Sequence, residues 1–364
     1  MNQNRYCVIM AGGAGTRLWP MSRNDRPKQF LTIMNTSKSF IQTTYDRFKK
    51  ILPAENIIVI TGEKYAALVR EHLPDLDEKN LLLEPYSRNT AICIAYATYT
   101  LLKRDSKARI VVSPADHLIF DESEFIDTIN KAFDAIEEKN VLMTLGVIPQ
   151  RADTNYGYIQ ATGGKAALLN SVPVPVKTFT EKPNKELAEI LISTGEFFWN
   201  SGIFVWRGKT IKDELEKHLP ELRLLFRGWE NALGSPLEKD FILKAYADAS
   251  NISIDYAVME KTDKAWIFPV KFDWADIGSW DSLYEYSTNK DSKGNVCFSK
   301  KKLLEGTSNT MIVMDDKKKL IAIKGLEDYL VIDTEDALVI CPKDGKNFKE
   351  FVANIAMPEY EKFR

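Results

Sequence analysis

The sequence predicts an α/β fold in which a mainly parallel, mixed sheet is followed by a small all-β unit. Over the first 150 residues, short apolar runs alternate with longer amphipathic stretches, a pattern typical of parallel strands covered by helices on both faces. From about residue 295 onward, short apolar runs follow one another without such stretches between them. At 364 residues, the chain is long enough to bury a large core.

The strands and helices of the first part follow from the apolar pattern. Short runs of aliphatic residues predict strands at 8–10, 57–60, 81–83, 110–112 and 141–145. Amphipathic stretches predict helices at 39–50, 64–72, 89–103 and 122–138. Residues 150–285 are less regular, and Gly, Asn and Trp recur there as in loops and hairpins that line a site. Ligands of parallel sheets collect beyond the carboxyl ends of strands, which directs attention to 11–30, 84–90 and 113–117.

The last part of the chain has a repetitive texture. The runs TMIVMDD, KLIAIKG, DYLVIDT and DALVICP are spaced by roughly ten residues and separated by Asp, Gly and Lys turns, which favours a rolled or solenoid sheet. The polar, turn-rich stretch STNKDSKGN precedes them. We therefore predict two domains, residues 1–288 and residues 289–364.

Composition excludes several classes of protein. The net charge is −2 and the pI is near 6.1, so the chain has no general attraction for nucleic acid or for an anionic membrane. No apolar run approaches the roughly 20 residues that span a bilayer, and no leader is apparent. The four cysteines are scattered, which predicts neither structural zinc nor a disulfide framework. We expect a cytoplasmic protein without nucleic-acid or membrane partners.

The stretch VIMAGGAGTRLWPMSRNDRPKQF, residues 8–30, is the first chemically informative segment. A dinucleotide-binding loop needs a third glycine where Leu18 stands, and an ATP-hydrolysing loop needs Gly-Lys-Ser/Thr where Gly15 is followed by Thr16 and Arg17. Phosphate binding remains the natural chemistry, because glycines let backbone amides approach a polyphosphate, and Arg17 and Lys28 add charge. The alternative is a tight glycine turn with basic residues on the surface.

This stretch resembles the signature of sugar-nucleotide pyrophosphorylases, and its LWPMSR and PKQF details resemble the mannose-1-phosphate guanylyltransferase branch. Further stretches resemble that branch in the same order: EPYSRNTA, SPADH, NYGYI, FTEKP, WNSGIFVW, SIDYAVMEK and DWADIGSW. The resemblance runs from about residue 5 to about residue 340. It implies a Rossmann-like nucleotidyltransferase domain and a C-terminal left-handed β-helix, with a role for the latter in packing or in forming a homodimer. Some members carry a fused isomerase domain, which we do not expect in a chain that ends at Arg364.

The reaction that the resemblance implies is GTP plus α-D-mannose 1-phosphate giving GDP-mannose and diphosphate, with Mg²⁺ as cofactor. The attacking sugar phosphate is already an anion, so the protein must neutralise charge and align groups rather than supply a base. The implied catalytic residues are Arg17, Lys28, Asp116 and Asp276. The two aspartates are the implied magnesium ligands, which fits the preference of that ion for carboxylate oxygens. A lone aspartate is more often a turn or a helix cap, and His117 beside Asp116 is better explained by structure than by proton transfer.

The implied nucleotide-binding residues are Ala11, Gly12, Gly13, Gly15, Thr16, Arg17, Lys28, Glu84, Asn89 and Thr90. Guanine presents N1–H and N2–H₂ side by side, and one carboxylate can accept both, whereas adenine has no such pair. Glu84, which follows a predicted strand, is therefore the candidate for base selection, together with Asn89 and Thr90. The alternative is that Glu84 pairs with Arg88 or caps a helix, and Asn89 could be the N-cap of the helix that follows.

The implied sugar-phosphate residues are Tyr156, Gly157, Glu181, Lys182 and Asn200. In the resemblance Glu181 holds sugar hydroxyls and Lys182 holds the sugar phosphate, while the Tyr156–Gly157 backbone and the Asn200 side chain adjoin the sugar. Asp255 and Glu260 match the family pattern without an assignable role.

Two other functions stay open at this stage. One is a guanylyltransferase for another sugar 1-phosphate, such as a heptose phosphate. The other is a non-catalytic, regulatory relative that binds a sugar nucleotide, which should have lost a phosphate or metal ligand.

Overall fold

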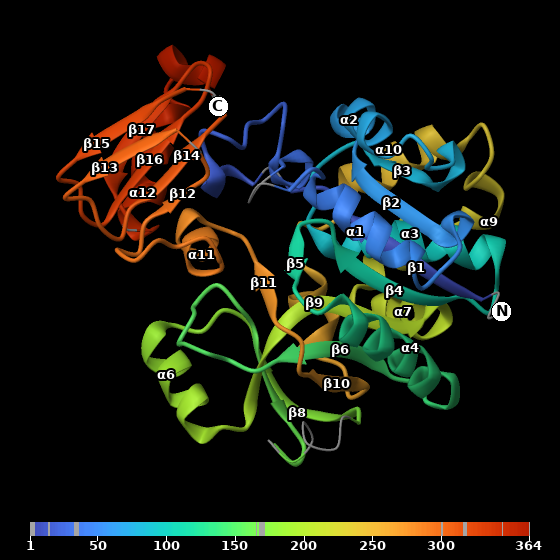
Figure 1. Ribbon diagram of the computed structural model, residues 1–364. Helices are drawn as coiled ribbons and strands as arrows, with labels where there is room; N and C mark the ends of the chain where they lie inside the picture. The colour runs from blue at the N-terminus through green and yellow to red at the C-terminus, as the bar shows by residue number, and fades with distance from the viewer. Residues whose placement is uncertain are drawn as a thin grey trace. The chain divides into compact units, whose positions relative to one another are not determined.

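The computed structural model describes residues 4–13, 15–32, 36–164, 166, 172–299, 301–315, 319–343 and 345–363 (Figure 1). The chain forms two compact units. The first consists of Met1–Gly12, Thr44–Ala115 and Ile119–Trp274, and the second of Gly13–Thr43, Asp116–Leu118 and Ala275–Arg364. These units group segments by contact in space, whereas the predicted domains are divided at one point along the chain, between residues 288 and 289. That boundary stays a prediction.

The first unit is built on a mixed sheet that has nine strands among the described residues, in the order β3-β2-β1-β4-β9-β6-β10-β8-β7. Its strands are β1 (Arg5–Met10), β2 (Ile57–Gly62), β3 (Leu81–Glu84), β4 (Arg109–Pro114), β6 (Leu142–Val147), β7 (Tyr158–Ala161), β8 (Val174–Thr180), β9 (Phe197–Arg207) and β10 (Ala265–Val270). Strands β3, β2, β1 and β4 run parallel, as do β6 and β10, and β9 runs antiparallel to both β4 and β6. The predicted α/β class is confirmed.

Helices cover this sheet: α1 (Phe40–Lys49), α2 (Ala66–His72), α3 (Thr90–Arg104), α4 (Glu122–Glu138), α6 (Lys185–Thr194), α7 (Gly208–His218), α8 (Pro220–Leu225), α9 (Trp229–Ala232) and α10 (Glu238–Asp248). Val8, Ile58 and Val112 pack into one apolar cluster with α3, α7 and α10. Successive strand side chains alternate between faces, so the equally buried Cys7, Val59 and Val111 fill the opposite face. Burial on both faces explains the continuous apolar runs in these strands.

The five strands and four helices predicted for the first 150 residues are present. The main difference is that the predicted helix at 64–72 begins as a 3₁₀ turn and becomes α2 only at Ala66. The stretch WNSGIFVW was expected in loops or hairpins, but it lies within β9, in the middle of the sheet, where Trp199 and Trp206 are buried. A strand buried on both faces lacks the alternation of apolar and polar residues that identifies a half-buried strand. Because this stretch also contains Asn, Ser and Gly, its sequence did not indicate a strand.

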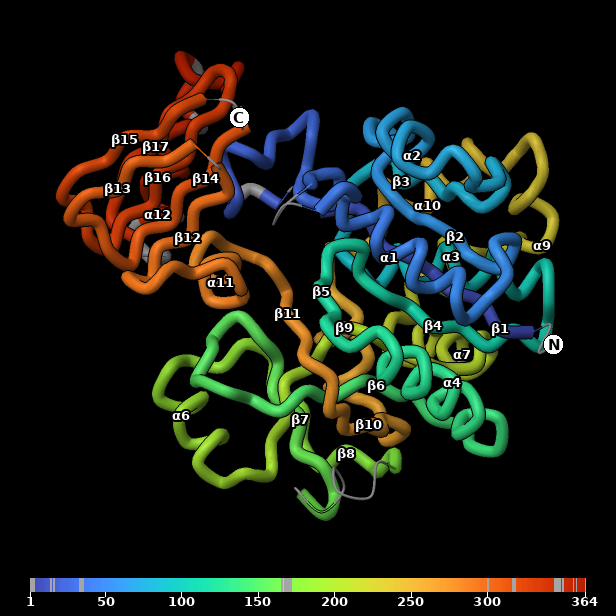
Figure 2. The backbone as a smooth tube through the Cα atoms, viewed as in Figure 1, coloured from blue at the N-terminus to red at the C-terminus, as the bar shows by residue number. Residues whose placement is uncertain are grey.

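The second unit contains a β-helix-like stack, whose parallel coils are visible in Figure 2. Its strands are β12 (Val296–Cys297), β13 (Lys302–Glu305), β14 (Met311–Met314), β15 (Ile321–Lys324), β16 (Tyr329–Asp333) and β17 (Leu338–Pro342). Strands β12, β14 and β16 pair in parallel, β13 pairs in parallel with β15, and β17 closes the stack antiparallel to β16. The predicted β-helix-like unit is confirmed. Helices α11 (Trp280–Glu285) and α12 (Gly345–Ala353) flank it.

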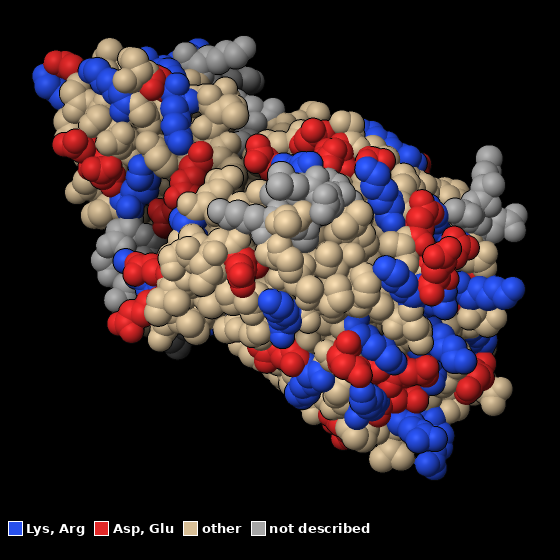
Figure 3. Space-filling view, turned by 90° about the horizontal axis from the view of Figure 1, so that it is seen from below, with Lys and Arg blue, Asp and Glu red and all other residues tan. Residues whose placement is uncertain are grey.

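None of the helices in the described part of the chain is both long enough and apolar enough to cross a membrane. On the face that Figure 3 shows, Lys and Arg side chains are interspersed with Asp and Glu. That face therefore presents no large field of a single sign.

Leu330 on β16 tests whether the interior of the stack holds the second unit together. Its side chain is 2% exposed, whereas Leu338 on the neighbouring β17 is 63% exposed. We expect Leu330→Ala to lower the free energy of unfolding by about 2–5 kcal/mol, because it leaves a cavity in a packed interior. Leu338→Ala should change it by less than about 0.5 kcal/mol. Urea denaturation followed by circular dichroism measures both, and equal effects would contradict the packing described.

Candidate active site

The glycine loop bends back against the segment that carries Lys28. Gly15 has a φ of +63°, in the left-handed region, and a Cβ at this position would lie 2.5 Å from the Cβ of Lys28. The Ser22 hydroxyl donates to the carbonyl of Gly15 at 2.6 Å and closes the turn. Glycine is therefore needed at position 15 both for its backbone conformation and for the close approach of Lys28.

Lys28 lies between two carboxylates from distant parts of the sequence. Its Nζ is 2.9 Å from Oδ2 of Asp116 and 3.0 Å from Oδ1 of Asp276. The lysine side chain is 4% exposed, whereas the carboxylates are 29% and 28% exposed, so both retain a path to solvent. The structure thus brings together, within the second unit, three of the four residues assigned to catalysis.

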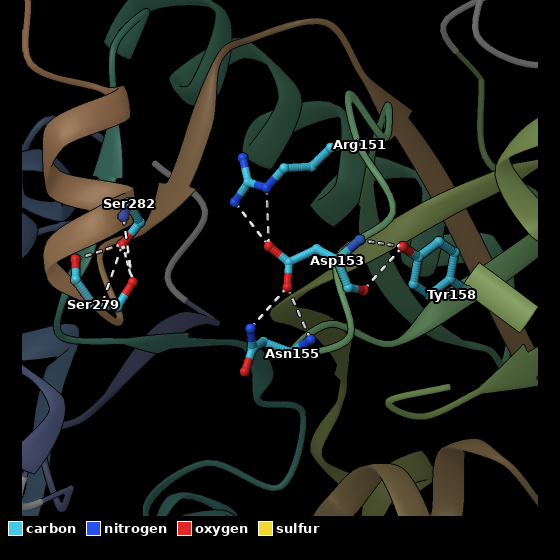
Figure 4. A network of polar contacts seen from close by, with 6 residues as sticks. All are labelled: Arg151, Asp153, Asn155, Tyr158, Ser279 and Ser282. Atoms are coloured by element: carbon cyan, nitrogen blue, oxygen red, sulfur yellow. Dashed lines mark hydrogen bonds and ion pairs between the residues drawn. The ribbon is translucent and has the colours of Figure 1, made fainter. Parts of the chain in front are cut away.

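Local structure explains how the two aspartates meet. Asp116 immediately precedes β5 (His117–Ile119), and Asp276 is the last residue of β11 (Trp274–Asp276). These two strands pair with each other, which fixes the ends that carry the aspartates. After Asp276 the chain turns at Gly278, and the side chains of Ser279 and Ser282 form a capping box at the start of α11 (Figure 4).

The charges at this site favour the ionised form of Asp276. Burial alone would raise the pKa of Asp276, but Lys28, His117 and Arg17 together hold that pKa well below its usual range. Burial likewise opposes the charge on Lys28, yet the two aspartates raise its pKa. Arg17 is exposed and lies against Gly278, where a Cβ would be 3.1 Å from its Nη2. Because Arg17 stays accessible, its guanidinium can bind an anion.

The segment that follows the glycine loop is anchored to the β-helix-like stack. Leu18, Trp19 and Leu31 belong to the same apolar cluster as residues of β14 and β16. The indole of Trp19 donates to the carbonyl of Phe363 at 2.6 Å, and the indole of Trp280 donates to the carbonyl of Trp19 at 2.9 Å. The position of Lys28 thus depends on the C-terminal part of the chain.

Glu84 occupies a buried position in the first unit. It is 8% exposed and accepts a hydrogen bond from the Tyr246 hydroxyl at 3.0 Å. Burial raises the pKa of Glu84 to about 7, and the bond from Tyr246 partly opposes that rise. A Cβ on Gly12 would lie 3.1 Å from Oε2 of Glu84, so the glycine loop begins beside this carboxylate. Arg88, the alternative partner, donates instead to the backbone carbonyls of Tyr246 and Ala247.

The other nucleotide-site residues are placed as follows. Asn89 is the N-cap of α3, as the alternative interpretation allowed, and its side chain accepts from the backbone of Thr90 at 2.9 Å. The Thr90 hydroxyl accepts from the backbone of Ile254 at 2.8 Å. Ala11 donates to the carbonyl of Ile60 at 2.8 Å and is buried, whereas Gly12 and Gly13 are exposed. The side chain of Thr16 lies outside the described part of the structure.

Four of the residues assigned to sugar phosphate meet in the first unit. Lys182 donates to Oε1 of Glu181 at 2.7 Å, and the Asn200 backbone donates to the carbonyl of Gly157 at 2.8 Å. A Cβ on Gly157 would lie 2.3 Å from Oε2 of Glu181, an oxygen that is buried and has no hydrogen-bond partner among the described residues. An unpaired buried carboxylate oxygen is costly, so this atom is poised to accept from a bound hydroxyl.

Tyr156 packs against Trp199 and Trp274, with ring centroids 4.9 and 5.2 Å apart. The loop before it is ordered by Asp153, which accepts from Arg151 and from Asn155 (Figure 4). The hydroxyl of Tyr158 adds bonds to the backbone of Asp153. Asp153 thus shapes the backbone around Gly157, a role that the sequence did not reveal.

The structure also gives Asp255 and Glu260 a place. Asp255 accepts from the Asn200 amide at 2.9 Å, and Glu260 accepts from the backbone of Glu181 at 3.0 Å. Both stand at a π-helical turn, Asp255–Met259, an irregularity that is frequent at functional sites. Burial, and then repulsion from Glu181, raise the pKa of Asp255 to about 7. These residues position Asn200 and Glu181, and only their match to the family pattern could have singled them out from sequence.

The pair of aspartates fits a hard divalent cation. No group of three or more His, Cys, Asp or Glu side chains gathers as a metal site anywhere in the described ranges. Asp116 and Asp276 present two carboxylates to one point, at Lys28 Nζ. Magnesium is commonly held by one or two carboxylates, with substrate phosphates completing its shell. The donor set therefore suits that ion.

Comparison with known proteins decides the family. Residues 6–293 match the nucleotidyl transferase family, and residues 306–354 match the MannoseP isomerase/GMP-like beta-helix domain. The chain belongs to the nucleotidyl transferase family. It is therefore an enzyme of the class that transfers a nucleotidyl group.

Relatives in this family carry a more specific name. A mannose-1-phosphate guanylyltransferase of Klebsiella pneumoniae is 37% identical over 368 residues, covering 98% of this chain and 76% of the relative. One of Salmonella montevideo is 38% identical over 355 residues, covering 94% of this chain and 73% of the relative. A crystal structure described as mannose-1-phosphate geranyltransferase from Thermus thermophilus has a TM-score of 0.84 and 28% identity, covering 97% of this chain and 99% of that one.

Gly15 offers a test of the loop geometry in this nucleotidyl transferase. We expect Gly15→Ala to lower the free energy of unfolding by about 1–2 kcal/mol or more, because a left-handed backbone is costly for alanine. The Cβ would also collide with Lys28. Gly13→Ala is the matched control, since a Cβ there meets nothing within 4 Å. Thermal and urea unfolding measure both, and equal stabilities would contradict the described turn.

Proposed function

We propose that the enzyme is a mannose-1-phosphate guanylyltransferase, converting GTP and α-D-mannose 1-phosphate into GDP-mannose and diphosphate. The names of the relatives support this assignment. The observation that carries it is the buried Lys28 ammonium within 3.0 Å of two carboxylates from distant segments. A protein that only bound sugar nucleotides would not need to keep this arrangement.

The residues of the second unit suit a reaction that displaces diphosphate from a nucleotide. Arg17 is exposed and can bind phosphate oxygens through two parallel N–H groups. Lys28 contributes a compact charge that cannot move far, since its neighbours enclose it. Asp116 and Asp276 would hold Mg²⁺, which when bound supplies Lewis-acid polarisation of phosphate oxygens. The chain's own part is to hold these groups in place before substrate arrives.

No general base is needed for this chemistry. A sugar phosphate is anionic at neutral pH, so its oxygen can attack the α-phosphorus directly, and the bond to diphosphate breaks as the new bond forms. His117 is 7% exposed and contributes to the field that keeps Asp276 ionised. We assign it an electrostatic and structural role.

Two sets of residues in the first unit would select the substrates. Ionised Glu84 can accept from N1–H and N2–H₂ of guanine. The hydrogen bond from the Tyr246 hydroxyl holds the carboxylate in position. Glu181 would accept from sugar hydroxyls through its unpaired oxygen, and Lys182, which is 55% exposed, would bind the sugar phosphate. Asn200 would donate to the sugar with its remaining amide hydrogen.

We further propose residues 1–288 as the transferase domain and 289–364 as the β-helix domain. A cytoplasmic location agrees with four free cysteines in the described structure. A homodimer is a further proposal, and light scattering after size exclusion tests it.

A diphosphate-release assay tests the reaction. The purified protein receives Mg²⁺, each of the four common nucleoside triphosphates in turn, and a panel of sugar 1-phosphates that includes a heptose phosphate. We expect release with GTP and mannose 1-phosphate, and absence of release with that pair would reject the proposed function. Faster release with another sugar phosphate would reassign the substrate.

The aspartates provide a test of the phosphate site. We expect Asp116→Asn and Asp276→Asn each to reduce kcat by at least about 100-fold, because each removes a charge that would hold the cation. Asp273→Asn is the control, since Asp273 is exposed and lies just before the strand that ends at Asp276. Thermal unfolding of each variant separates loss of activity from loss of fold. Near-normal turnover in either variant would remove that residue from the site.

The raised pKa of Glu84 predicts a pH dependence. Below its pKa of about 7 the carboxyl is protonated and loses one of its acceptor sites for guanine. The KM for GTP should therefore rise as the pH falls through 7, by up to about tenfold per unit, and level off above 8. Glu84→Gln should lose this dependence and retain only the contribution from protonation of GTP itself. Parallel KM profiles for the two proteins would contradict the assignment of Glu84.

A further inference from the structure

A cavity of about 620 Å³ lies in the first unit, and none of the residues assigned above lines it. Its walls come from β3, α3, α10 and the loop before α10, and Figure 1 shows β3 and α10 close together. The wall is largely apolar, with contributions from Leu81, Leu82, Leu83, Leu233, Ile242 and Leu243. A cavity of this size and character is typical of small-molecule sites.

The charges around this cavity are not balanced. Arg104 donates to the side-chain oxygen of Asn80 at 2.7 Å and to a backbone carbonyl, and Lys103 donates to the carbonyl of Leu233. These hydrogen-bond partners are all neutral, and the charges that act on Arg104 from further away include those of Glu238 and Asp77.

Two of the three acidic residues of the lining are paired with cations. Glu78 pairs with Arg70, and Glu63 is 3.1 Å from Lys239. Glu238 accepts from the Tyr96 hydroxyl and from the backbone of Gly234, both at 2.6 Å. Glu238 has no cationic hydrogen-bond partner in the described ranges, and its charge raises the pKa of Arg104 while burial lowers that pKa. Lys103 and Arg104 together therefore leave one positive charge in excess over Glu238, and a bound anion would offset it.

A further polar group lies in the wall. Thr100 on α3 lines the cavity and is 5% exposed, and its hydroxyl has no hydrogen-bond partner among the described residues. Buried hydroxyls are nearly always hydrogen-bonded, because an unpaired one costs about 1–3 kcal/mol. A ligand with a polar atom next to its apolar body would satisfy this group.

We propose that this cavity is a second ligand site, which binds a small organic anion with an apolar body and thereby alters GTP binding. The walls connect it to Glu84 in two ways. Strand β3 ends at Glu84, and Tyr246, which donates to Glu84, lies one helical turn after Ile242 on α10. A ligand that shifts α10 against β3 changes the bond that holds Glu84. This effect on GTP, unlike the binding itself, rests on the proposed function.

Two fluorescent probes test the binding. The probe 8-anilinonaphthalene-1-sulfonate has an apolar body and one negative charge, and N-phenyl-1-naphthylamine is its neutral analogue. Leu243→Trp fills the cavity from a residue that is 41% exposed, and Leu224→Trp adds the same ring at a residue of α8 that is 64% exposed and does not line it. We expect Leu243→Trp to raise the Kd of the sulfonate at least about tenfold, and Leu224→Trp to leave it within about twofold.

Separate measurements test the role of positive charge in binding and the effect of the bound ligand on GTP. Lys103→Gln should raise the Kd of the sulfonate about fivefold and leave that of the neutral probe unchanged. Saturating sulfonate should change the KM for GTP at least about twofold in the parent protein and not in Leu243→Trp. Equal sulfonate binding by the parent and Leu243→Trp, with unchanged thermal midpoints, would overturn the site.

Other results separate the parts of the proposal. Sulfonate binding that is lost in Leu243→Trp, with an unchanged KM for GTP, would support the site and overturn its coupling to GTP. The same binding in a protein without GTP turnover would support the site and reject the proposed function.

Discussion

The placement of one ammonium group between two carboxylates is the constraint on which the second unit depends. Lys28 is almost completely buried, and a buried charge is tolerated only when opposite charges compensate it. Asp116 and Asp276 supply that compensation, and each stands at the end of one of two strands that pair with each other. The glycine turn, the β5–β11 pairing and the capping box at Ser279 all serve to keep these three groups together.

The constraint on the first unit is a different one: it must place polar groups at the ends of apolar strands. Glu84 ends β3 and is held by one hydroxyl, while Glu181 keeps one oxygen unpaired beside Gly157. In both cases neighbouring groups hold the carboxylate in place, and the carboxylate can still accept further hydrogen bonds. This is what selective recognition of an N–H pair or of a diol requires, because a site with unpaired acceptors rejects ligands that cannot satisfy them.

Much of this was predictable from sequence, because apolar periodicity determines which segments are buried. The parallel strands and their helices follow from that pattern alone, and the residues of the glycine loop and of SPADH stand out by their chemistry. Three features did not follow. Strand β9 was hidden by its polar residues, and Asp153 resembled any loop aspartate. The direct contact of Lys28 with Asp276, 248 positions away, depends on tertiary packing that no local pattern encodes, and only the family resemblance assigned both residues to one site.

The bond from Trp19 to the carbonyl of Phe363 spans 344 positions of sequence and so bears on the timing of folding during synthesis. The sheet of the first unit can form from residues up to Val270 as they emerge from the ribosome. The basic segment that carries Lys28 is made among the first 30 residues, whereas the stack that supports it is made from Val296 onward. That segment must therefore wait, without these partners, until the residues of the stack and Phe363 have been made. A nascent chain of this protein would have an ordered sheet long before Lys28 had its supporting contacts.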